Sequence, residues 1–373
     1  MMDDRFPFTR IVRGLPASVP FVGPEALERR RGETFRVRVG ANESAFGISP
    51  LARDAMFRAV ERLSWYNDPE NHEIRAAIAG FHRVPFENVS VGSGIDDLLG
   101  LVVRVFVEPG ETVVTSLGAY PTFNYHVNGF GGLLHFVPYR DDKNDLGGLA
   151  EAAAETEARM VYLSNPDNPT GTWHPAAKIR ALEGMLPDRC LLILDEAYSE
   201  FATQDAPPPM APIRPRVIRM RTFSKAHGMA GARIGYAVAD ADVVGALEKV
   251  RHHYGVNRVA QAGALASLED TDFVANVVMS VVEGRADYAR LGESLGLPTL
   301  PSATNFVAFD AGTVDRANTI LETLQRHGAF VRKPAAAPLD RFFRVTVGTP
   351  EERLLFAGIL RTVLAELSRD GSP

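Results

Sequence analysis

Lys225 stands in the run of the chain that carries the most chemistry, Thr222-Phe-Ser-Lys-Ala-His-Gly-Met-Ala-Gly-Ala-Arg-Ile-Gly-Tyr236. Its amine follows two hydroxyl residues, Thr222 and Ser224, and a fixed cation, Arg233, comes later among small residues. A lysine amine can form an imine with an aldehyde and can then move a proton, provided that its pKa is lowered from about 10.4. The alternative is an ordinary surface lysine, and the neighbouring glycines and Arg233 argue against it.

A carboxylate is predicted at the end of a buried strand, in the run Leu192-Ile-Leu-Asp-Glu-Ala-Tyr198. A buried Asp195 without a partner would be costly, so we expect a cationic group beside it. The protonated ring nitrogen of pyridoxal phosphate (PLP) would be such a group, because a nearby anion keeps that ring an electron sink. Tyr198 and Asn168, the latter from the run Asn165-Pro-Asp-Asn-Pro-Thr-Gly171, would bind the ring oxygen. In the alternative, Asp195 caps the next helix.

A phosphate group needs backbone N–H donors at a helix start, hydroxyl groups and a fixed cation. The turn Gly92-Ser-Gly94, which precedes a predicted helix, would supply the first. Thr222 and Ser224 would supply the second, and Arg233 the third. A simple tight turn is the alternative for the glycines.

Arg344 lies in an apolar strand pattern, Phe342-Phe-Arg-Val-Thr-Val-Gly348, where a guanidinium is expensive without a ligand. A bidentate pair with a substrate carboxylate would justify the position. A structural salt bridge is the alternative.

The composition describes a chain of 373 residues with 46% hydrophobic residues, 23% charged residues and a net charge of −6. This balance is typical of a globular protein, and the acidic charge argues against nucleic acid as a partner. The one cysteine, Cys190, excludes an internal disulfide framework and a Cys-rich metal cluster, and we interpret it as core filling. The polar first residues and the lack of a long apolar stretch predict a cytoplasmic protein with no membrane partner.

Short apolar runs alternate with helical patterns along residues 50–240. The predicted strands are Val89–Val91, Thr112–Ser116, Leu133–Val137, Met160–Ser164, Leu191–Asp195, Val217–Arg221 and Ile234–Ala239. The predicted helices among them are Pro50–Leu63, His72–His82 and Asp96–Phe106. Such alternation predicts a mostly parallel α/β sheet that is buried on both faces. Ligands of such sheets lie beyond the carboxyl ends of the strands, where Asn165, Asp195 and the segment 222–225 should meet.

The two ends of the chain give a different pattern. Residues 1 to about 40 predict an extended arm, and residues 240–268 predict one long helical stretch that leads out of the main domain. The remainder alternates helices and strands in a smaller lobe, in the segments Asp272–Leu291, Asn305–Asp310, Thr319–His327, Phe343–Val347 and Glu351–Ser368.

With these motifs in place, the chain resembles the fold-type I PLP-dependent aminotransferases of class I/II, and most of all the histidinol-phosphate aminotransferase group. The resemblance extends from about Pro20 to Arg361 and is carried by the Lys225, Asn165–Gly171 and Asp195–Tyr198 motifs. It implies a large domain with a mostly parallel seven-stranded sheet flanked by helices, and a smaller α+β domain. The expected division is 1–45 for the N-terminal arm and part of the small domain, 46–255 for the large PLP-binding domain and 256–373 for the small C-terminal domain.

The resemblance also implies the roles of single residues. Lys225 would form the imine with PLP and move the proton, Asp195 would pair with the ring nitrogen, and Tyr198 would assist them. The implied cofactor-binding residues are Gly94, Ile95, Phe123 (stacked on the ring), Asn168, Asp195, Tyr198, Thr222, Ser224, Lys225, Arg233 and Tyr66 (reaching the phosphate of the neighbouring subunit). The implied substrate-binding residues are Arg344 (α-carboxylate), Arg332 (substrate phosphate), Asn42 (entrance) and Phe21, which stands where the group usually has a tyrosine.

The function implied by the resemblance is a ping-pong aminotransferase. It would move an amino group from an amino acid or an amino-phosphate to a 2-oxo acid such as 2-oxoglutarate. The role of Tyr66 implies a homodimer with shared active sites. A PLP-dependent decarboxylase or lyase on the same scaffold is the alternative. A PLP-sensing regulator would need an appended DNA-binding segment and does not fit the acidic net charge.

Overall fold

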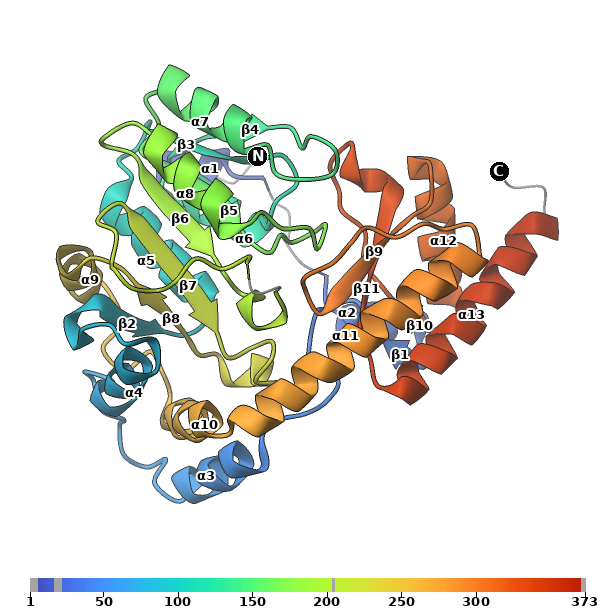
Figure 1. Cartoon of the computed structure of the whole chain (residues 1–373), viewed down its shortest axis with the longest axis horizontal. Helices are drawn as coiled ribbons and strands as arrows, with labels where there is room; N and C mark the ends of the chain where they lie inside the picture. Colours follow the sequence, from blue (N-terminus) through green and yellow to red (C-terminus); the bar gives the residue numbers. More distant parts are fainter. Residues whose placement is uncertain (1–5, 17–21, 203–204, 370–373) are drawn as a thin grey trace.

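A seven-stranded sheet in the order β2-β8-β7-β6-β5-β3-β4 forms the centre of the larger lobe (Figure 1). The computed structural model describes residues 6–16, 22–202 and 205–369. The strands are β2 (Val89–Gly92), β3 (Thr112–Ser116), β4 (Leu133–Val137), β5 (Met160–Ser164), β6 (Leu191–Asp195), β7 (Val217–Thr222) and β8 (Gly235–Val238). Within this sheet β8 runs antiparallel to both of its neighbours, β2 and β7, and the other neighbouring strands pair in parallel. The prediction of a mostly parallel α/β sheet is confirmed.

Helices cover both faces of the sheet. One face packs against α5 (Ile95–Phe106), α6 (Pro121–Gly129) and α9 (Ala241–Glu248). The other packs against α7 (Leu146–Glu155) and α8 (Ala176–Met185). Central strands such as β5 and β6 therefore read as continuous apolar runs, because both faces of each strand are buried. Cys190 is buried in the second of these cores, as interpreted from the sequence.

The second lobe is built mainly from the C-terminal part of the chain. Its elements are α11 (Thr271–Ser294), β9 (Phe306–Asp310), α12 (Val314–Arg326), β10 (Ala329–Phe330), β11 (Phe342–Thr346) and α13 (Pro350–Arg369). β11 pairs antiparallel with β9, and β10 pairs with β1 (Val37–Arg38), so the N-terminal segment completes this lobe. Short 3-10 turns occur at Phe86–Asn88, Ser199–Phe201, Ala230–Ala232 and Leu339–Arg341. The division at residues 45 and 255 stays a prediction.

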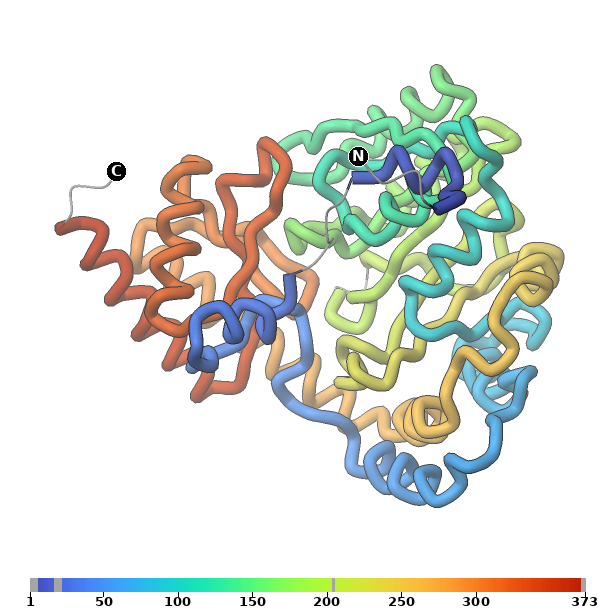
Figure 2. Tube along the Cα trace, turned by 180° about the vertical axis from the view of Figure 1, so that it is seen from behind, coloured from blue at the N-terminus to red at the C-terminus, as the bar shows by residue number. Residues whose placement is uncertain are grey.

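The expectation of an extended N-terminal arm is wrong for two segments. Residues Arg10–Gly14 form α1, which packs against α6, and Pro24–Arg31 form α2 beside the second lobe (Figure 2). α2 begins with a proline and ends at Gly32, whose φ of 78° is left-handed. Proline is common at the first position of a helix, and glycine is common just after the last. This helix could therefore have been predicted from the sequence.

The expectation of one long helix over 240–268 is also corrected, because the chain forms two helices there. After α9, the chain turns and restarts as α10 (Arg258–Glu269), where the Asn257 side chain accepts a hydrogen bond from the backbone N–H of Ala260. Such an asparagine cap starts a new helix. α10 packs against α3 (Pro50–Val60) and α4 (His72–His82).

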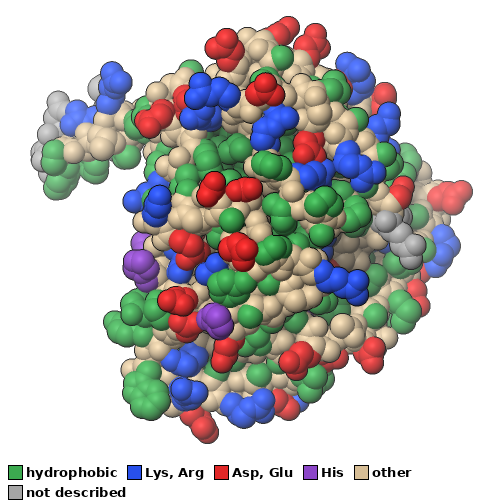
Figure 3. Space-filling view, turned by 60° about the vertical axis from the view of Figure 1, so that its left-hand side comes forward, with side chains coloured by type: hydrophobic (Ala, Val, Ile, Leu, Met, Phe, Trp, Pro, Cys, Tyr) green, Lys and Arg blue, Asp and Glu red, His purple; other side chains and the backbone are tan. Residues whose placement is uncertain are grey.

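The surface carries acidic and basic side chains interspersed with apolar ones, as the face in Figure 3 shows. No helix in the described ranges is long and apolar enough to cross a membrane. Within the same ranges, the His, Cys, Asp and Glu side chains form no group that could hold a metal ion.

Candidate functional site

Three strand ends bring the predicted site residues together. Parallel pairing places Ser164 opposite Asp195 and Asp195 opposite Met220, so β5, β6 and β7 end at one edge of the sheet. The backbone N–H of Asn165 donates to the carbonyl of Asp195 at 2.9 Å. The convergence expected from the sequence is therefore present at the carboxyl edge of the sheet.

Lys225 follows β7 and points toward the N-terminal segment. Its Nζ donates to the backbone carbonyl of Asn42 at 2.9 Å and lies 5.6 Å from the centre of the Tyr198 ring. Burial, together with the nearby cation of Arg344, lowers the pKa of Lys225 to about 8. The amine is thus close to the range in which it can accept a proton at neutral pH.

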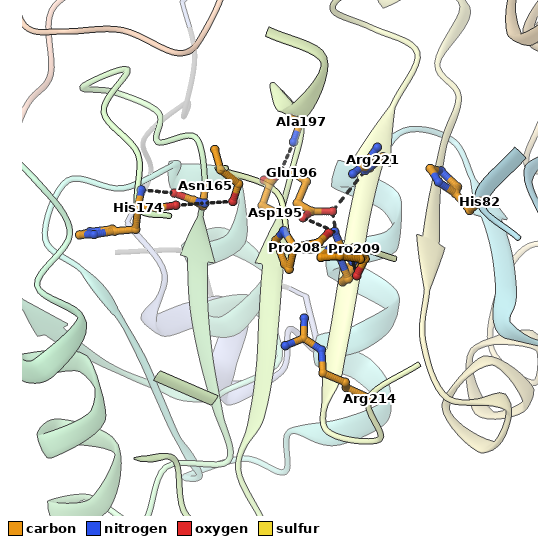
Figure 4. Close-up of polar contacts among 12 residues, drawn as sticks. His82, Asn165, His174, Asp195, Glu196, Ala197, Pro208, Pro209, Arg214 and Arg221 are labelled. Atoms are coloured by element: carbon orange, nitrogen blue, oxygen red, sulfur yellow. Dashed lines mark hydrogen bonds and ion pairs between the residues drawn. The ribbon is translucent and has the colours of Figure 1, made fainter. Parts of the chain in front are cut away.

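Asp195 is held by two neutral donors. The Tyr162 hydroxyl donates to its Oδ2 at 2.7 Å. The Ala197 backbone N–H donates to its Oδ1 at 3.0 Å (Figure 4). Burial raises the pKa of Asp195 to about 6, although both hydrogen bonds act in the opposite direction. No salt bridge reaches this carboxylate from the part of the chain that the structure describes, so its charge has no cationic counterpart there.

Asn42 connects Tyr198 to the second lobe. Its Nδ2 donates to the Tyr198 hydroxyl at 2.8 Å, and its own backbone N–H donates to Thr346 Oγ1 at 3.0 Å. Asn305 donates to the Asn42 carbonyl at 3.1 Å, the same carbonyl that accepts from Lys225. Burial raises the pKa of Tyr198 to about 12, while the cation of Arg344 acts to lower it.

A cradle of backbone and guanidinium lies at the N-terminus of α5. Gly94 precedes the helix with a φ of 87°, and a Cβ atom there would lie 2.7 Å from Nη2 of Arg233. Nη2 of Arg233 lies 3.4 Å from Oδ2 of Asp96. Thr222 Oγ1 donates to Ser224 Oγ at 2.9 Å, so the two predicted hydroxyls are adjacent. Backbone donors at a helix start, together with a cation, form an anion site.

Two arginines lie on paired backbone segments of the second lobe. The backbones of Arg332 and Arg344 pair, with the Arg344 N–H donating to the Arg332 carbonyl at 2.6 Å. Nη1 of Arg344 donates to Oδ1 of Asn168, whereas its Nε is buried without a hydrogen-bond partner in the described part of the chain. Burial lowers the pKa of Arg344 to about 10, and the cation of Arg332 adds to this effect. Nη2 of Arg332 donates to the Val22 carbonyl at 3.0 Å.

One predicted residue does not join this group as expected. Phe123 is 0% exposed and its ring stacks on Tyr162 at 4.6 Å, within the core beneath α6. A ring without accessible surface cannot cover a cofactor, so this expectation is corrected. Tyr66 is 79% exposed, and its ring packs on Tyr254. Phe21 lies outside the described residues.

Four residues that the sequence did not single out take part in the site. Tyr120 donates to Oδ1 of Asp96 at 2.9 Å, and it lies three residues before Phe123. Tyr162 and Asn305 are the partners of Asp195 and Asn42 described above. The fourth, Asp167, accepts from the side chains of Tyr139, Asn144 and Thr170 and fixes the turn that carries Asn168. Asp167 and Tyr120 were visible as parts of motifs, in the runs 165–171 and 120–123.

The residues present fit PLP. A buried carboxylate without a cation suits a ring nitrogen, the Gly94 cradle suits a phosphate, and a lysine with a lowered pKa suits an aldehyde. This fold and site define a fold-type I PLP-dependent enzyme.

The comparisons with known proteins identify the family. The family model for class I and II aminotransferases matches residues 37–357. A histidinol-phosphate aminotransferase of Nitrosococcus oceani is 34% identical over 358 residues, which cover 95% of this chain and 96% of that protein. The crystal structure of histidinol-phosphate aminotransferase from Sinorhizobium meliloti, in complex with pyridoxal-5′-phosphate, is 46% identical, with a TM-score of 0.94 over 97% of this chain and 98% of that one. The aspartate aminotransferase of Thermus thermophilus shares the fold, at 22% identity, 97% and 99% coverage and a TM-score of 0.82.

The chain therefore belongs to the class I and II aminotransferases and is a PLP-dependent aminotransferase.

Proposed function

We propose that this aminotransferase takes its amino group from an amine that carries an anionic group, of the histidinol-phosphate kind, and passes it to a 2-oxo acid such as 2-oxoglutarate. One observation carries the proposal: two guanidinium groups, of Arg332 and Arg344, come from paired segments at one site, and the Nε of Arg344 is buried without a partner in the described chain. Guanidinium groups bind phosphate and carboxylate in a bidentate way. The names of the relatives at 34% and 46% identity support the same substrate class.

Lys225 is the proposed catalytic base, and its roles follow from its position. PLP, when bound, supplies an electron sink for the charge that develops when a proton leaves the carbon next to the amine. Lys225 Nζ takes that proton and returns it, and its lowered pKa keeps part of the amine neutral. Asp195 holds the ring nitrogen protonated by its negative charge.

The other cofactor contacts are assigned by position. Tyr198 and Asn168 orient the ring oxygen, and Tyr120 is proposed as the aromatic residue of the 120–123 segment at the ring, in place of Phe123. The phosphate contacts proposed are the backbone at Gly94 and Ile95, the hydroxyls of Thr222 and Ser224, and the Arg233 cation. Asn42 lines the substrate entrance, where its carbonyl also holds Lys225.

A donor and acceptor screen tests the substrate class. Purified enzyme is offered histidinol phosphate, histidinol, phenylalanine and glutamate, and the expected order of kcat/KM places the phosphorylated amine above its unphosphorylated counterpart. Arg332→Gln should lower kcat/KM for histidinol phosphate by about tenfold or more, since charged hydrogen bonds are lost, and should change kcat/KM for histidinol little. Equal use of histidinol and its phosphate by the wild type would contradict the proposal.

Half-reactions test the reaction type separately. A single addition of donor should convert bound PLP to pyridoxamine phosphate, which absorbance reports. Release of carbon dioxide or ammonia from the donor alone would instead indicate a decarboxylase or a lyase.

A homodimer with shared sites is the proposed assembly. Its support is a group of exposed apolar side chains in and after α3, which are Phe57, Val60, Leu63, Trp65 and Tyr66. Beside them lies a cavity of about 770 Å³, lined by residues of α3, α4 and α10. Exposed apolar patches of this kind mark interaction surfaces. Tyr66 would then reach the phosphate site of the partner subunit.

Mixing two impaired variants tests the shared site. Lys225→Ala and Tyr66→Ala proteins are dissociated and reassociated together, and mixed dimers should regain activity because one of their two sites has both residues. No recovery in mixtures that contain mixed dimers would contradict the role of Tyr66 across the interface. A cytoplasmic location stays a prediction, which fractionation of the source cells would check.

A further inference from the structure

Tyr162 makes a contact with Asp195 that the proposed reaction does not yet use. Tyr162 lies on β5, is 1% exposed and donates its hydroxyl hydrogen to Oδ2 of Asp195 at 2.7 Å. The other oxygen, Oδ1, accepts from the backbone N–H of Ala197 at 3.0 Å. Each carboxylate oxygen therefore has one donor from the chain and keeps a second lone pair for another partner.

The ring of Tyr162 is fixed by its neighbours. Phe123 stacks on it with an interplanar angle of 17°, and both rings belong to the core between the sheet and α6. Close packing in such a core leaves the ring no room to turn. The hydroxyl is thus held at one point next to Oδ2, and Phe123 acts on the site through Tyr162.

The chemistry of the two donors is informative because both are neutral. A cation beside Asp195 would compensate its charge and compete with a ring nitrogen. A hydroxyl and a backbone N–H stabilise the negative charge of the buried carboxylate without cancelling it. The uncompensated charge then favours the protonated form of whatever ring nitrogen lies next to it.

We infer that Tyr162 is a positioning residue of the reaction: its hydroxyl keeps the Asp195 carboxylate ionised and correctly turned toward the ring nitrogen, and Phe123 holds the Tyr162 ring in place. The inference rests on the proposed role of Asp195.

Tyr162→Phe tests the inference, because phenylalanine keeps the stack on Phe123 and removes only the donor. We expect kcat to fall by about tenfold or more, as for the loss of a hydrogen bond to a charged group, with a much smaller change in KM. The acid limb of the kcat/KM profile should move toward higher pH by about one unit, because the carboxylate is then easier to protonate. The absorbance of bound PLP should show the same shift in a pH titration.

Tyr236→Phe is the matched control. Tyr236 is also a buried tyrosine of the sheet, and its hydroxyl is bonded to His82 Nε2 at 2.7 Å and interacts with Arg221, but it does not contact Asp195. Removing this hydroxyl should lower the melting temperature to a similar extent and leave the pH profile and the spectrum unchanged. A Tyr162→Phe enzyme that matches Tyr236→Phe in kcat and in both titrations would overturn the inference.

A second variant covers the case in which Tyr162→Phe does not fold. Phe123→Leu keeps the hydroxyl but loosens the ring, and the same shift of the acid limb is expected with a smaller size. An unshifted profile in this folded variant would then overturn the inference by itself. Asp195→Asn separates the two proposals: if it keeps wild-type activity, the proposed role of Asp195 fails, whatever the Tyr162 variants show.

Discussion

Glu196, the neighbour of Asp195, allows a test of which contacts stabilise the carboxyl edge of the sheet, where the site lies. Its side chain is fully buried and accepts hydrogen bonds from two arginines of β7. Arg219 donates from Nη2 at 2.6 Å and from Nε at 3.1 Å, and Arg221 donates from Nε at 3.2 Å. Arg219 also donates to the carbonyls of Pro208 and Pro209, each at 2.8 Å. Figure 4 shows both prolines and Arg221 beside Glu196. This one carboxylate therefore connects the end of β6 to β7 and, through Arg219, to the loop that contains Pro208 and Pro209.

The perturbation is Glu196→Gln, which keeps the shape and removes the charge. The amide keeps one acceptor oxygen and turns an N–H₂ group toward guanidinium donors, so Arg219 loses its counterion and Arg221 keeps only the nearby charge of Glu200. Breaking a buried ion pair on one side costs about 3–5 kcal/mol. For a protein of this size, a loss of 3 kcal/mol lowers the melting temperature by roughly 4 °C.

Thermal unfolding of wild type and variant, at equal PLP content, measures this loss, because bound ligand itself raises the melting temperature. Glu183→Gln is the control: Glu183 pairs with Arg214, and both side chains are 19% exposed. A more exposed pair contributes about 1 kcal/mol or less, so this variant should melt within about 1 °C of wild type. If Glu196→Gln melts no lower than Glu183→Gln, the reasoning about the buried cluster is refuted.

Three further outcomes are expected. Lys225→Ala should fold with an unchanged circular dichroism spectrum and show negligible turnover, and near-wild-type turnover would count against its role. Arg344→Lys should raise KM for the anionic substrate by about tenfold or more, because lysine lacks the planar guanidinium that donates to Asn168 and would bind the substrate in a bidentate way. Steady-state kinetics measures this change. Asp195 has a raised pKa of about 6, so it loses its charge as the pH falls through that value. The affinity for PLP should therefore weaken as the pH falls from about 7 to about 5 in equilibrium titrations, and an unchanged affinity over this range would contradict this.

The strands of the large lobe could be predicted from the sequence because each is an apolar run with clear limits. Met160–Ser164 and Leu191–Asp195 have the limits that the structure gives. The site residues at strand ends followed from the same pattern, since a parallel sheet brings its carboxyl ends to one edge. The role of the lysine motif could be proposed from the sequence because amine, hydroxyls and cation stand close together in the chain.

Contacts between distant segments could not be predicted in this way. Tyr162 and Asp195 are 33 residues apart, and only the register of β5 and β6 brings the hydroxyl to the carboxylate. In the same way, the packing of α6 decides that Phe123 turns into the core, whereas Tyr120 reaches Asp96. An aromatic residue at either position satisfies the sequence pattern, so the pattern does not distinguish them.

The contacts of Asn42 explain why the lysine and the second lobe have to be considered together. Its carbonyl accepts from Lys225 and from Asn305, and its backbone N–H donates to Thr346, so a single residue joins the lysine loop to two segments of the smaller lobe. The φ of 56° at Asn42 is left-handed, a conformation that asparagine tolerates better than most residues. When Lys225 turns away from this carbonyl to act on a ligand, Asn305 still satisfies it, and no buried acceptor is left without a donor. The movement required by the proposed role of Lys225 would therefore leave the contacts of Asn42 with Asn305 and Thr346 intact.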